Sequence, residues 1–435
     1  MPSRRIGEVA TLQLVRPHHR RRVRIRGRGY FKRLGPGFVT GAADDDPSGI
    51  GTYSQVGAAY GFGLLWSTIA VAPMAAAVQE TAARLGVTTE KGLASLIRDR
   101  FPRPVLYVAV ALTVVANTFN IGADIRSMAA AAHLVVPVPT LLLVVLMTAG
   151  MIALVVSLPY HRYGRVLRWL VLSLLAYVVV LAVVHVDWGE VARNAAVPRL
   201  VGGSAGFAAL IAVFGTTVSP YLFFWQASEE VEEEIDHGEM GEPVTKEHIR
   251  AMRVDVIGGM TSAVFVAFCI VVAAAVTLHA KGITTINTPE QAAKALEPVA
   301  GGLAGLVFAL GVVGLGLLAV PVLAGSAAYA LSEAFSWNEG LSRTFRQAPG
   351  FYLTFGGSMI LGLALTFFAI SPIQGLYYAA ILNGLVAPPL IVLMFLLARS
   401  RDVVGRWRSG PLATTILIVT IAASVIAPVA ALVAL

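Results

Sequence analysis

Charged residues are scarce in this sequence, and cysteine is almost absent. Only 13% of the 435 residues are Asp, Glu, Lys or Arg, whereas soluble domains carry about 25%. The single cysteine, Cys269, excludes an internal disulfide framework and a metal cluster built from cysteines. Hydrophobic residues make up 57% of the chain. The composition therefore indicates a membrane protein rather than a soluble domain.

Long apolar segments fill most of the chain. A run of about 20 apolar residues can cross the hydrocarbon core of a bilayer as a helix. We expect an all-α, polytopic membrane domain over residues 35–435, preceded by a basic tail over residues 1–34. About eleven spans are predicted, at residues 36–58, 62–84, 104–129, 139–159, 166–186, 205–235, 254–278, 303–333, 351–370, 373–398 and 411–433.

The positions of Lys and Arg predict the orientation of these spans, because cytoplasmic loops carry an excess of both residues. With the basic tail in the cytoplasm, the inner loops hold Arg84, Lys91, Arg98, Arg100, Arg103, Arg162, Arg165, Arg168, Lys246, Arg250, Arg253, Arg343, Arg346, Arg399, Arg401, Arg406 and Arg408. An odd number of spans then places the C-terminus outside a plasma (inner) membrane. Two longer outer loops, 187–201 and 281–298, each predict a short amphipathic element. The net charge of +8 follows this topology and does not indicate nucleic-acid binding.

The first span is interrupted by charge and by proline. Asp44, Asp45 and Asp46 precede Pro47 in the middle of an apolar segment. Each aspartate at the bilayer centre costs about 2.5–3.5 kcal/mol on insertion scales, and a proline inside a helix breaks it. Non-helical backbone at this depth survives only inside protein or beside a water-filled cavity. The segment therefore predicts an unwound helix whose free carbonyls lie beside the Asp46 carboxylate.

The sixth span repeats this pattern, because Ser219 and Pro220 interrupt another apolar segment. Paired interruptions at the start of each five-span half indicate two inverted repeats, at about residues 35–186 and 203–398, with an extra helix at 411–433. In such proteins the binding site lies at the membrane midplane, between the interrupted helices. The alternative is that the two prolines only kink packed helices.

Several motifs resemble the Nramp family of divalent metal transporters. They are Gly35-Pro36-Gly37-Phe38, Tyr60-Gly61-Phe62-Gly63-Leu64-Leu65-Trp66 and the segment 82–94. The resemblance covers nearly the whole chain, because the motifs fall in order on successive spans. It implies a LeuT-type fold with spans 1–5 and 6–10 related by inversion. It also implies alternating-access transport, with a divalent metal ion as substrate, no cofactor and no enzymatic activity.

The chain departs from this family at the predicted metal site. The family motif Asp-Pro-Gly-Asn reads Asp46-Pro47-Ser48-Gly49 here, so the asparagine ligand falls on Gly49. The motif Met-Pro-His reads Ser219-Pro220-Tyr221, so a hydroxyl replaces the thioether and tyrosine replaces histidine. The resemblance then implies a site made only of oxygen donors: the Asp46 carboxylate, the Ser219 hydroxyl, and the carbonyls of Ala43 and Thr216.

These departures predict the transported ion and its coupling. Oxygen donors suit magnesium, calcium and manganese, whereas sulfur favours softer metals. The smaller side chains leave room for the waters that magnesium retains. We therefore expect import of Mg²⁺, with Mn²⁺ also carried, as in the Nramp-related magnesium transporter branch. Because tyrosine has an ordinary pKa of about 10 and the family's proton-pathway aspartate falls near Thr118, we expect weak or no proton coupling. The alternative is a proton-coupled Mn²⁺/Fe²⁺ transporter of the ordinary Nramp type.

Other polar residues inside the predicted spans are candidates for the surroundings of the ion or for its path. Asn117, Asn120 and Asp124 fall on one helical face. The alternative for them is hydrogen bonding between helices, with Arg126 neutralising Asp124. Further candidates are Asp45, Gly49, Tyr221, Gln226 and Asn383. We interpret the acidic run 229–236 as a solvated helix end; the alternative is a funnel that concentrates cations.

Two other function classes fit the sequence less well. An intramembrane aspartyl protease would use Asp46 and Asp124, but its Gly-x-Gly-Asp signature is missing. A transporter of organic solutes needs apolar walls and a larger pocket, whereas Gly, Ala, Ser and Asp occupy the predicted centre. We expect a monomer in the lipid bilayer, with the metal ion as its ligand and no nucleic-acid partner.

Overall fold

The computed structural model describes residues 35–157, 174–368 and 370–433, and the regular secondary structure in these ranges is entirely helical. The all-α prediction is therefore confirmed. The predicted basic tail lies outside the described residues. The same holds for the predicted inner loop with Arg162, Arg165 and Arg168, and for the start of the fifth predicted span.

The first half of the chain contains both long and short helices. In order, these helices are α1 (Pro36–Asp44), α2 (Pro47–Tyr60), α3 (Trp66–Thr89), α4 (Leu93–Arg100), α5 (Arg103–His133), α6 (Thr140–Ser157), α8 (Leu175–Val183) and α9 (Trp188–Ala196). The second half continues with α10 (Gly203–Thr217), α11 (Pro220–His237), α12 (Lys246–Thr277), α13 (Pro289–Ala293), α14 (Glu297–Ala300), α15 (Ala304–Phe335), α16 (Pro349–Leu365), α17 (Pro372–Arg399), α18 (Arg401–Val404) and α19 (Pro411–Val433).

Each predicted span has a helical counterpart in the described chain. Seven counterparts are long and apolar enough to cross a membrane: α5, α6, α10 with α11, α12, α15 with the turns before it, α17 and α19. The apolar helix α16 is shorter, with 17 residues. The other three predicted spans correspond to α1 with α2, to α3, and to α8. The chain is thus a multi-pass membrane protein.

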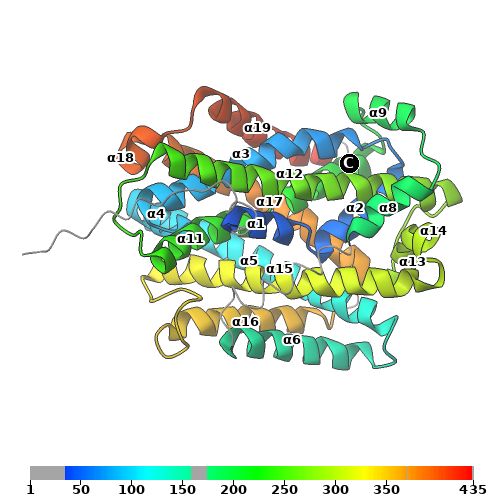
Figure 1. The fold of residues 1–435 in the computed structure, drawn as a ribbon, viewed down its shortest axis with the longest axis horizontal. Helices are drawn as coiled ribbons and strands as arrows, with labels where there is room; N and C mark the ends of the chain where they lie inside the picture. Colours follow the sequence, from blue (N-terminus) through cyan, green and yellow to red (C-terminus); the bar gives the residue numbers. More distant parts are fainter. Residues whose placement is uncertain (1–34, 158–173, 369, 434–435) are drawn as a thin grey trace, which may run out of the picture. The chain divides into compact units, whose positions relative to one another are not determined.

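The broken helix formed by α1 and α2 lies in the middle of the bundle. It packs against α12 on one side, while α15 and α5 pack against each other close by (Figure 1). Gly37 and Gly41 lie so close to the backbone of Val256 and Gly259 that an added Cβ would overlap it. Small residues of this kind let membrane helices approach closely. The tight α1–α12 contact holds the start of the broken helix in place.

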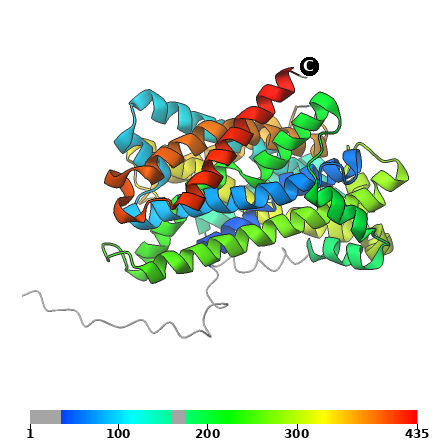
Figure 2. The same ribbon diagram turned by 90° about the horizontal axis from the view of Figure 1, so that it is seen from above.

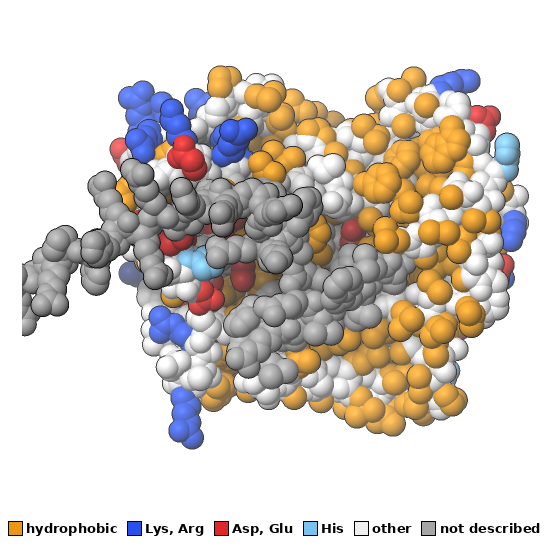
Figure 3. Space-filling model, in the orientation of Figure 1, with side chains coloured by type: hydrophobic (Ala, Val, Ile, Leu, Met, Phe, Trp, Pro, Cys, Tyr) orange, Lys and Arg blue, Asp and Glu red, His pale blue; other side chains and the backbone are white. Residues whose placement is uncertain are grey.

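The outer surface of the bundle suits a lipid environment. Figure 3 shows many hydrophobic side chains over the right half and the lower edge of this view, with Lys and Arg side chains at its left and right ends. The last helix, α19, contacts α3, α10 and α17 from the outside (Figure 2). Only 17% of its apolar 18-residue stretch is buried inside the protein. This exposure is what a helix facing lipid tails requires.

Both predicted amphipathic elements are present as short helices. The segment 187–201 contains α9, whose first turn is capped by the Asp187 carboxylate. The segment 281–298 contains α13, where Thr288 and Gln291 form a reciprocal capping box. These elements lie at the end of the bundle opposite to α4 and α18 (Figure 1).

Two charged regions differ from their predicted surroundings. Arg84 does not lie in a loop: it is inside α3 and fully buried, because its guanidinium pairs with the Glu80 carboxylate. The acidic run 229–236 is not simply a solvated helix end, because Glu230 and Glu234 are buried. The Glu230 carboxylate accepts a hydrogen bond from the Gln226 amide at 2.7 Å. Packing of α11 within the bundle removes these carboxylates from solvent.

Candidate metal site

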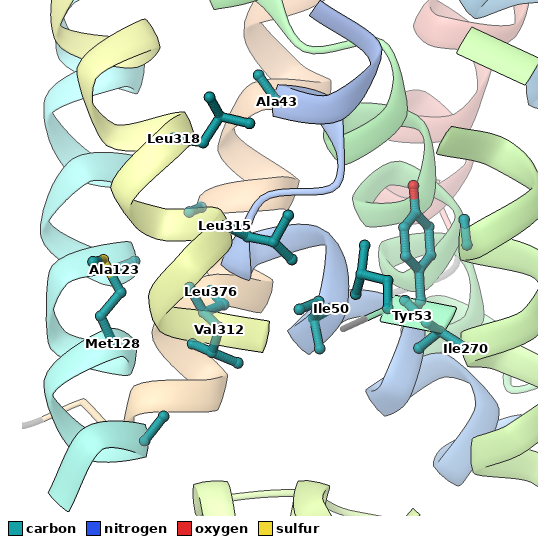
Figure 4. Packing of buried hydrophobic residues seen from close by; sticks show 14 of the residues in the cluster. Ala43, Ile50, Tyr53, Ala123, Met128, Ile270, Val312, Leu315, Leu318 and Leu376 are labelled. Atoms are coloured by element: carbon teal, nitrogen blue, oxygen red, sulfur yellow. The ribbon is translucent and has the colours of Figure 1, made fainter. Parts of the chain in front are cut away.

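The first helix unwinds where the sequence predicts it. Helix α1 ends at Asp44 and α2 begins at Pro47, with Asp45 and Asp46 outside helical geometry between them. Figure 4 shows this extended link, with Ala43 at the end of α1 and Ile50 in the first turns of α2. Proline is tolerated at the first helical position, where no donor is required. The Asp46 side chain caps α2 by accepting the Gly49 N–H at 2.7 Å.

The second interruption has the same form. Helix α10 ends at Thr217 and α11 begins at Pro220, with Val218 and Ser219 between them. Ser219 is extended, with φ −76° and ψ 130°. Both predicted interruptions are therefore confirmed, and the alternative of two merely kinked helices is not. The reason is local, since in each case a proline starts the second half of the helix.

Four donors surround the Asp46 carboxylate, which is 1% exposed. Its Oδ1 accepts the Ser48 hydroxyl at 2.6 Å and the Gly49 N–H at 2.7 Å. Its Oδ2 accepts the Asn120 amide at 3.1 Å and the Tyr221 hydroxyl at 3.5 Å. The four donors come from α2, α5 and α11, so three helices converge on this one side chain.

Hydroxyl groups join the two interrupted helices to each other. The Ser48 Oγ lies 3.3 Å from the Thr216 Oγ1, and the Tyr53 hydroxyl lies 2.7 Å from the Thr217 Oγ1. A Cβ added at Gly49 would lie 3.6 Å from the Thr216 Oγ1, an ordinary contact distance. The start of α2 and the end of α10 are therefore direct neighbours, as a midplane site between the interruptions requires.

The other predicted ligands have partners within the protein. The Ser219 hydroxyl lies 2.8 Å from the Gly215 carbonyl and 2.9 Å from the Thr216 carbonyl, both in α10. The Ala43 carbonyl accepts the Tyr221 hydroxyl at 2.8 Å. A carbonyl oxygen has two lone pairs, so each carbonyl retains one for an ion. The roles of Ser219, Ala43 and Thr216 as ligands stay predictions.

The polar face of α5 turns toward Asp46. Asn120 donates to Asp46, and the Asn117 amide donates to the Leu323 carbonyl of α15 at 3.0 Å. Asp124 is fully buried and lies within electrostatic range of Asp46. Arg126 does not neutralise Asp124, because its guanidinium donates instead to backbone carbonyls after α16, those of Thr366 and Phe368.

Buried polar atoms without a hydrogen-bond partner gather among the predicted residues. In the described part of the chain they include one side-chain oxygen each of Asp44, Asn117, Asn120 and Gln226, both oxygens of Asp124, and both polar atoms of Asn383. Buried polar groups are normally satisfied, because an unmet donor or acceptor is costly. These side chains therefore require water or a hydrated ion beside them.

Negative charge in this region lacks a positive partner. None of the ion pairs among the described residues involves Asp44, Asp45, Asp46 or Asp124. In the whole described part of the chain, no group of three or more His, Cys, Asp or Glu side chains is placed to hold a metal. An ion at Asp46 would therefore complete its coordination with neutral oxygens and water.

Sequence reasoning missed three hydroxyl-bearing residues of this region, namely Ser48, Tyr53 and Thr217. For Ser48 a signal exists, because a hydroxyl two residues after a capping aspartate can reach its carboxylate. For Tyr53 and Thr217 the signal was weak, because a hydroxyl in an apolar helix usually bonds its own backbone. Thr217 does so as well, toward the Val213 carbonyl at 2.7 Å.

Known proteins resemble this chain in sequence and in fold. Residues 37–434 match the model of the family described as Natural resistance-associated macrophage protein-like, or Nramp. The divalent metal cation transporter MntH of Klebsiella pneumoniae (strain 342) is 32% identical over 292 residues, which cover 65% of this chain and 68% of that protein. MntH of Yersinia pestis (strain Pestoides F) has the same identity and coverage.

Solved structures share the fold at low sequence identity. A manganese transporter of Eremococcus coleocola superposes with a TM-score of 0.73 at 17% identity, over 92% of this chain and 87% of that chain. Mhp1, a transporter of the nucleobase-cation-symport-1 family, superposes with a TM-score of 0.55 at 16% identity, over 92% and 91%. The expected LeuT-type fold is thereby confirmed. With the family model spanning both interrupted helices, this chain belongs to the Nramp family.

Proposed function

We propose that this protein imports Mg²⁺, and also Mn²⁺, across the membrane by alternating access. Family membership shows that the chain is a divalent metal cation transporter of the Nramp type and not an enzyme. The metal is its substrate rather than a cofactor. The identity of the ion, its coupling and the residues that hold it are our proposal.

One observation carries the proposal. A buried carboxylate, Asp46, lies at the junction of two interrupted helices, with Asp44, Asp45 and Asp124 nearby. Within the described ranges, no basic side chain pairs with any of them. Like charges in a low-dielectric interior repel strongly. A doubly charged cation relieves this repulsion, and the amide oxygen of Asn120, which accepts no hydrogen bond, provides an acceptor for its water shell.

The choice of magnesium rests on the types of atom that surround the Asp46 carboxylate. Among the described residues, Asp46 accepts hydrogen bonds from hydroxyl groups, a side-chain amide and a backbone N–H, and no sulfur atom bonds to it. Hard oxygen donors suit magnesium and manganese. Magnesium keeps several waters when it binds, and the unpartnered oxygens of Asn117, Asn120 and Gln226 suit a hydrated ion.

Flux in proteoliposomes tests this function. We expect Mg²⁺ uptake with wild-type protein and none above background with Asp46→Asn, because the substitution removes the charge next to the ion. A matched control is Asp402→Asn, whose carboxylate is 81% exposed and far from the site in sequence. Uptake by Asp46→Asn at the wild-type rate would refute the proposal.

Ser219→Met tests the ligand assignment. Returning the thioether of the family motif should raise Mn²⁺ uptake relative to Mg²⁺ uptake, because sulfur favours the softer ion. If neither rate changes, Ser219 is not part of the site.

Proton-coupled Mn²⁺/Fe²⁺ transport of the ordinary Nramp type is the second candidate. Asp124 favours it, since this titratable carboxyl is buried and lies within electrostatic range of Asp46. In our proposal the membrane potential drives uptake instead, at about 2.3 kcal/mol per charge per 100 mV. Internal pH during metal influx separates the two: acidification that follows the metal supports coupling, and a constant pH supports our proposal.

The proposed orientation places the end of the bundle that carries α4 and α18 in the cytoplasm, with the C-terminus outside. We also propose that the protein acts as a monomer. The charge bias of the loops supports this orientation. Labelling of a cysteine added at the C-terminus of a Cys269→Ala protein, in intact cells, tests it with an impermeant reagent. Labelling only after permeabilisation would reverse the orientation.

A further inference from the structure

Ser48 makes the shortest of the four hydrogen bonds to the Asp46 carboxylate. Its hydroxyl donates to the Asp46 Oδ1 at 2.6 Å, and the same oxygen accepts the Gly49 N–H at 2.7 Å. Hydrogen bonds between a hydroxyl and a carboxylate at this length are among the strong ones. Ser48 is 1% exposed, so water does not compete for its hydroxyl from outside.

The two oxygens of Asp46 are held unequally. The Oδ1 atom accepts two short hydrogen bonds, from Ser48 and Gly49. The Oδ2 atom accepts two longer ones, from Asn120 at 3.1 Å and from Tyr221 at 3.5 Å. A contact at 3.5 Å lies at the limit for a hydrogen bond. An arriving cation therefore displaces the donors on Oδ2 at lower cost than those on Oδ1, so that Asp46 offers it one oxygen.

Helix capping alone does not account for this arrangement. The Gly49 N–H is sufficient to make Asp46 a helix cap, and the cap needs no hydroxyl from Ser48. The Ser48 Oγ also lies 3.3 Å from the Thr216 Oγ1 of α10. Ser48 thus ties the carboxylate to the second interrupted helix, at the place where an ion would pass between the two.

We infer that Ser48 determines ion specificity, because it occupies the Asp46 Oδ1 and so prevents two-oxygen coordination by the carboxylate. This inference rests on the proposed function and deepens it. Ca²⁺ readily takes a carboxylate through both oxygens, whereas Mg²⁺ keeps several waters and binds through few carboxylate atoms. A carboxylate limited to one free oxygen selects Mg²⁺ over Ca²⁺.

Competition between the two ions in proteoliposomes tests the role of Ser48. We expect Ser48→Ala to transport, and we expect Ca²⁺ to inhibit its Mg²⁺ uptake at about tenfold lower concentration than in the wild type. That change corresponds to the loss of one hydrogen bond to a charged group. Ser48→Thr, which keeps the hydroxyl, should retain wild-type selectivity. Thr148→Ala in α6 is a matched control, because it removes a buried hydroxyl that donates to a carbonyl of its own helix and not to Asp46.

The outcomes separate this inference from the proposed function. Wild-type selectivity in Ser48→Ala overturns the role of Ser48, even if Asp46→Asn abolishes uptake as the proposed function requires. Uptake by Asp46→Asn at the wild-type rate overturns both. If Ser48→Ala does not transport, calorimetric titration of Ser48→Gly with Mg²⁺ and Ca²⁺ in detergent decides: a tenfold gain in relative Ca²⁺ affinity supports the inference, and unchanged relative affinity refutes it.

Discussion

Tyr221 stands where the Nramp motif has histidine, and it touches both sides of the first interruption. Its hydroxyl donates to the Ala43 carbonyl at 2.8 Å and lies 3.5 Å from the Asp46 Oδ2. Tyrosine does not change charge near neutral pH, whereas histidine does. At the scale of single residues, this one substitution leaves the site without the imidazole of the family motif.

Tyr221→His should therefore make metal uptake dependent on pH. A histidine titrates near pH 6.5, and its cationic form beside Asp46 repels a divalent ion. We expect uptake by this variant to fall more between about pH 7.5 and pH 5.5 than uptake by the wild type, because only the variant adds an imidazole to the site. Initial uptake rates across this range check the prediction, with Tyr221→Phe as the control that removes the hydroxyl without adding a titratable group. Identical pH profiles for Tyr221→His and the wild type would contradict it.

At the scale of elements, α1 depends on a cap supplied by another helix. The Asp255 carboxylate of α12 accepts the backbone N–H groups of Gly35, Gly37 and Phe38 at 3.2, 2.7 and 3.3 Å. A negative charge at a helix N-terminus satisfies free donors and interacts favourably with the helix dipole. Because α1 has only nine residues, this contact holds much of its first turn.

Asp255→Ala should loosen α1 against α12. We expect a loss of about 0.5–2 kcal/mol, the range for replacing a capping side chain by alanine, and a corresponding fall in the melting temperature in detergent. Hydrogen exchange should increase in α1 before it increases in α5 or α15. Unchanged melting and unchanged exchange in α1 would show that the three contacts contribute nothing.

In the connection between α15 and α16, the carboxyl group of Glu339 is largely buried and lies near other carboxylates. Burial, and then the negative charges of Glu333 and Glu232, raise the pKa of Glu339 to about 9. The folded state therefore binds this proton more tightly than the unfolded state, in which a glutamate has its ordinary pKa near 4.3. The sign follows from linkage: the stabilisation is fully present below the unfolded pKa and is lost as the pH rises toward 9.

Glu339→Gln should reduce this pH dependence. Glutamine keeps the neutral form at every pH, so we expect the melting temperature of the variant to fall less than that of the wild type between about pH 5 and pH 9. Thermal melts across that range provide the measurement, and Glu242→Gln, an exposed position, is the control. Parallel melting curves for Glu339→Gln and the wild type would refute the raised pKa.

At the scale of the whole molecule, a buried ion pair joins distant parts of the chain. Glu80 in α3 pairs with Arg84 of the same helix and with Arg253 of α12, at 3.2 and 2.7 Å. Arg84 also donates to the Trp407 carbonyl and the Ser409 hydroxyl, both at 2.7 Å. The network ties α3 and α12 to the connection that leads into α19.

Glu80→Gln should destabilise the protein strongly. Removing one partner leaves the fully buried guanidinium of Arg84 without its counter-charge, which costs about 3–5 kcal/mol. The double variant Glu80→Gln with Arg84→Met should recover much of that loss, because no buried charge is left unpaired. Thermal stability in detergent checks both variants. A double variant no more stable than Glu80→Gln alone would rule out an unpaired charge as the cause.

The sequence by itself determined the class of protein and the two interruptions. Run length, scarce charge and the motifs around Pro47 and Pro220 are local features, and local features decide where an apolar helix forms and where it breaks. The short helices α9 and α13 were predictable for the same reason, since their caps come from neighbouring residues.

Only the tertiary structure decided which groups meet at Asp46. Asn120 is 74 positions away from it in the chain, and Thr216 is 168 positions away from Ser48. The burial of Arg84 and of the acidic end of α11 likewise depends on which helices pack around them. A sequence pattern shows which face of a helix is polar, but the contacts of that face depend on long-range packing, which no local pattern encodes.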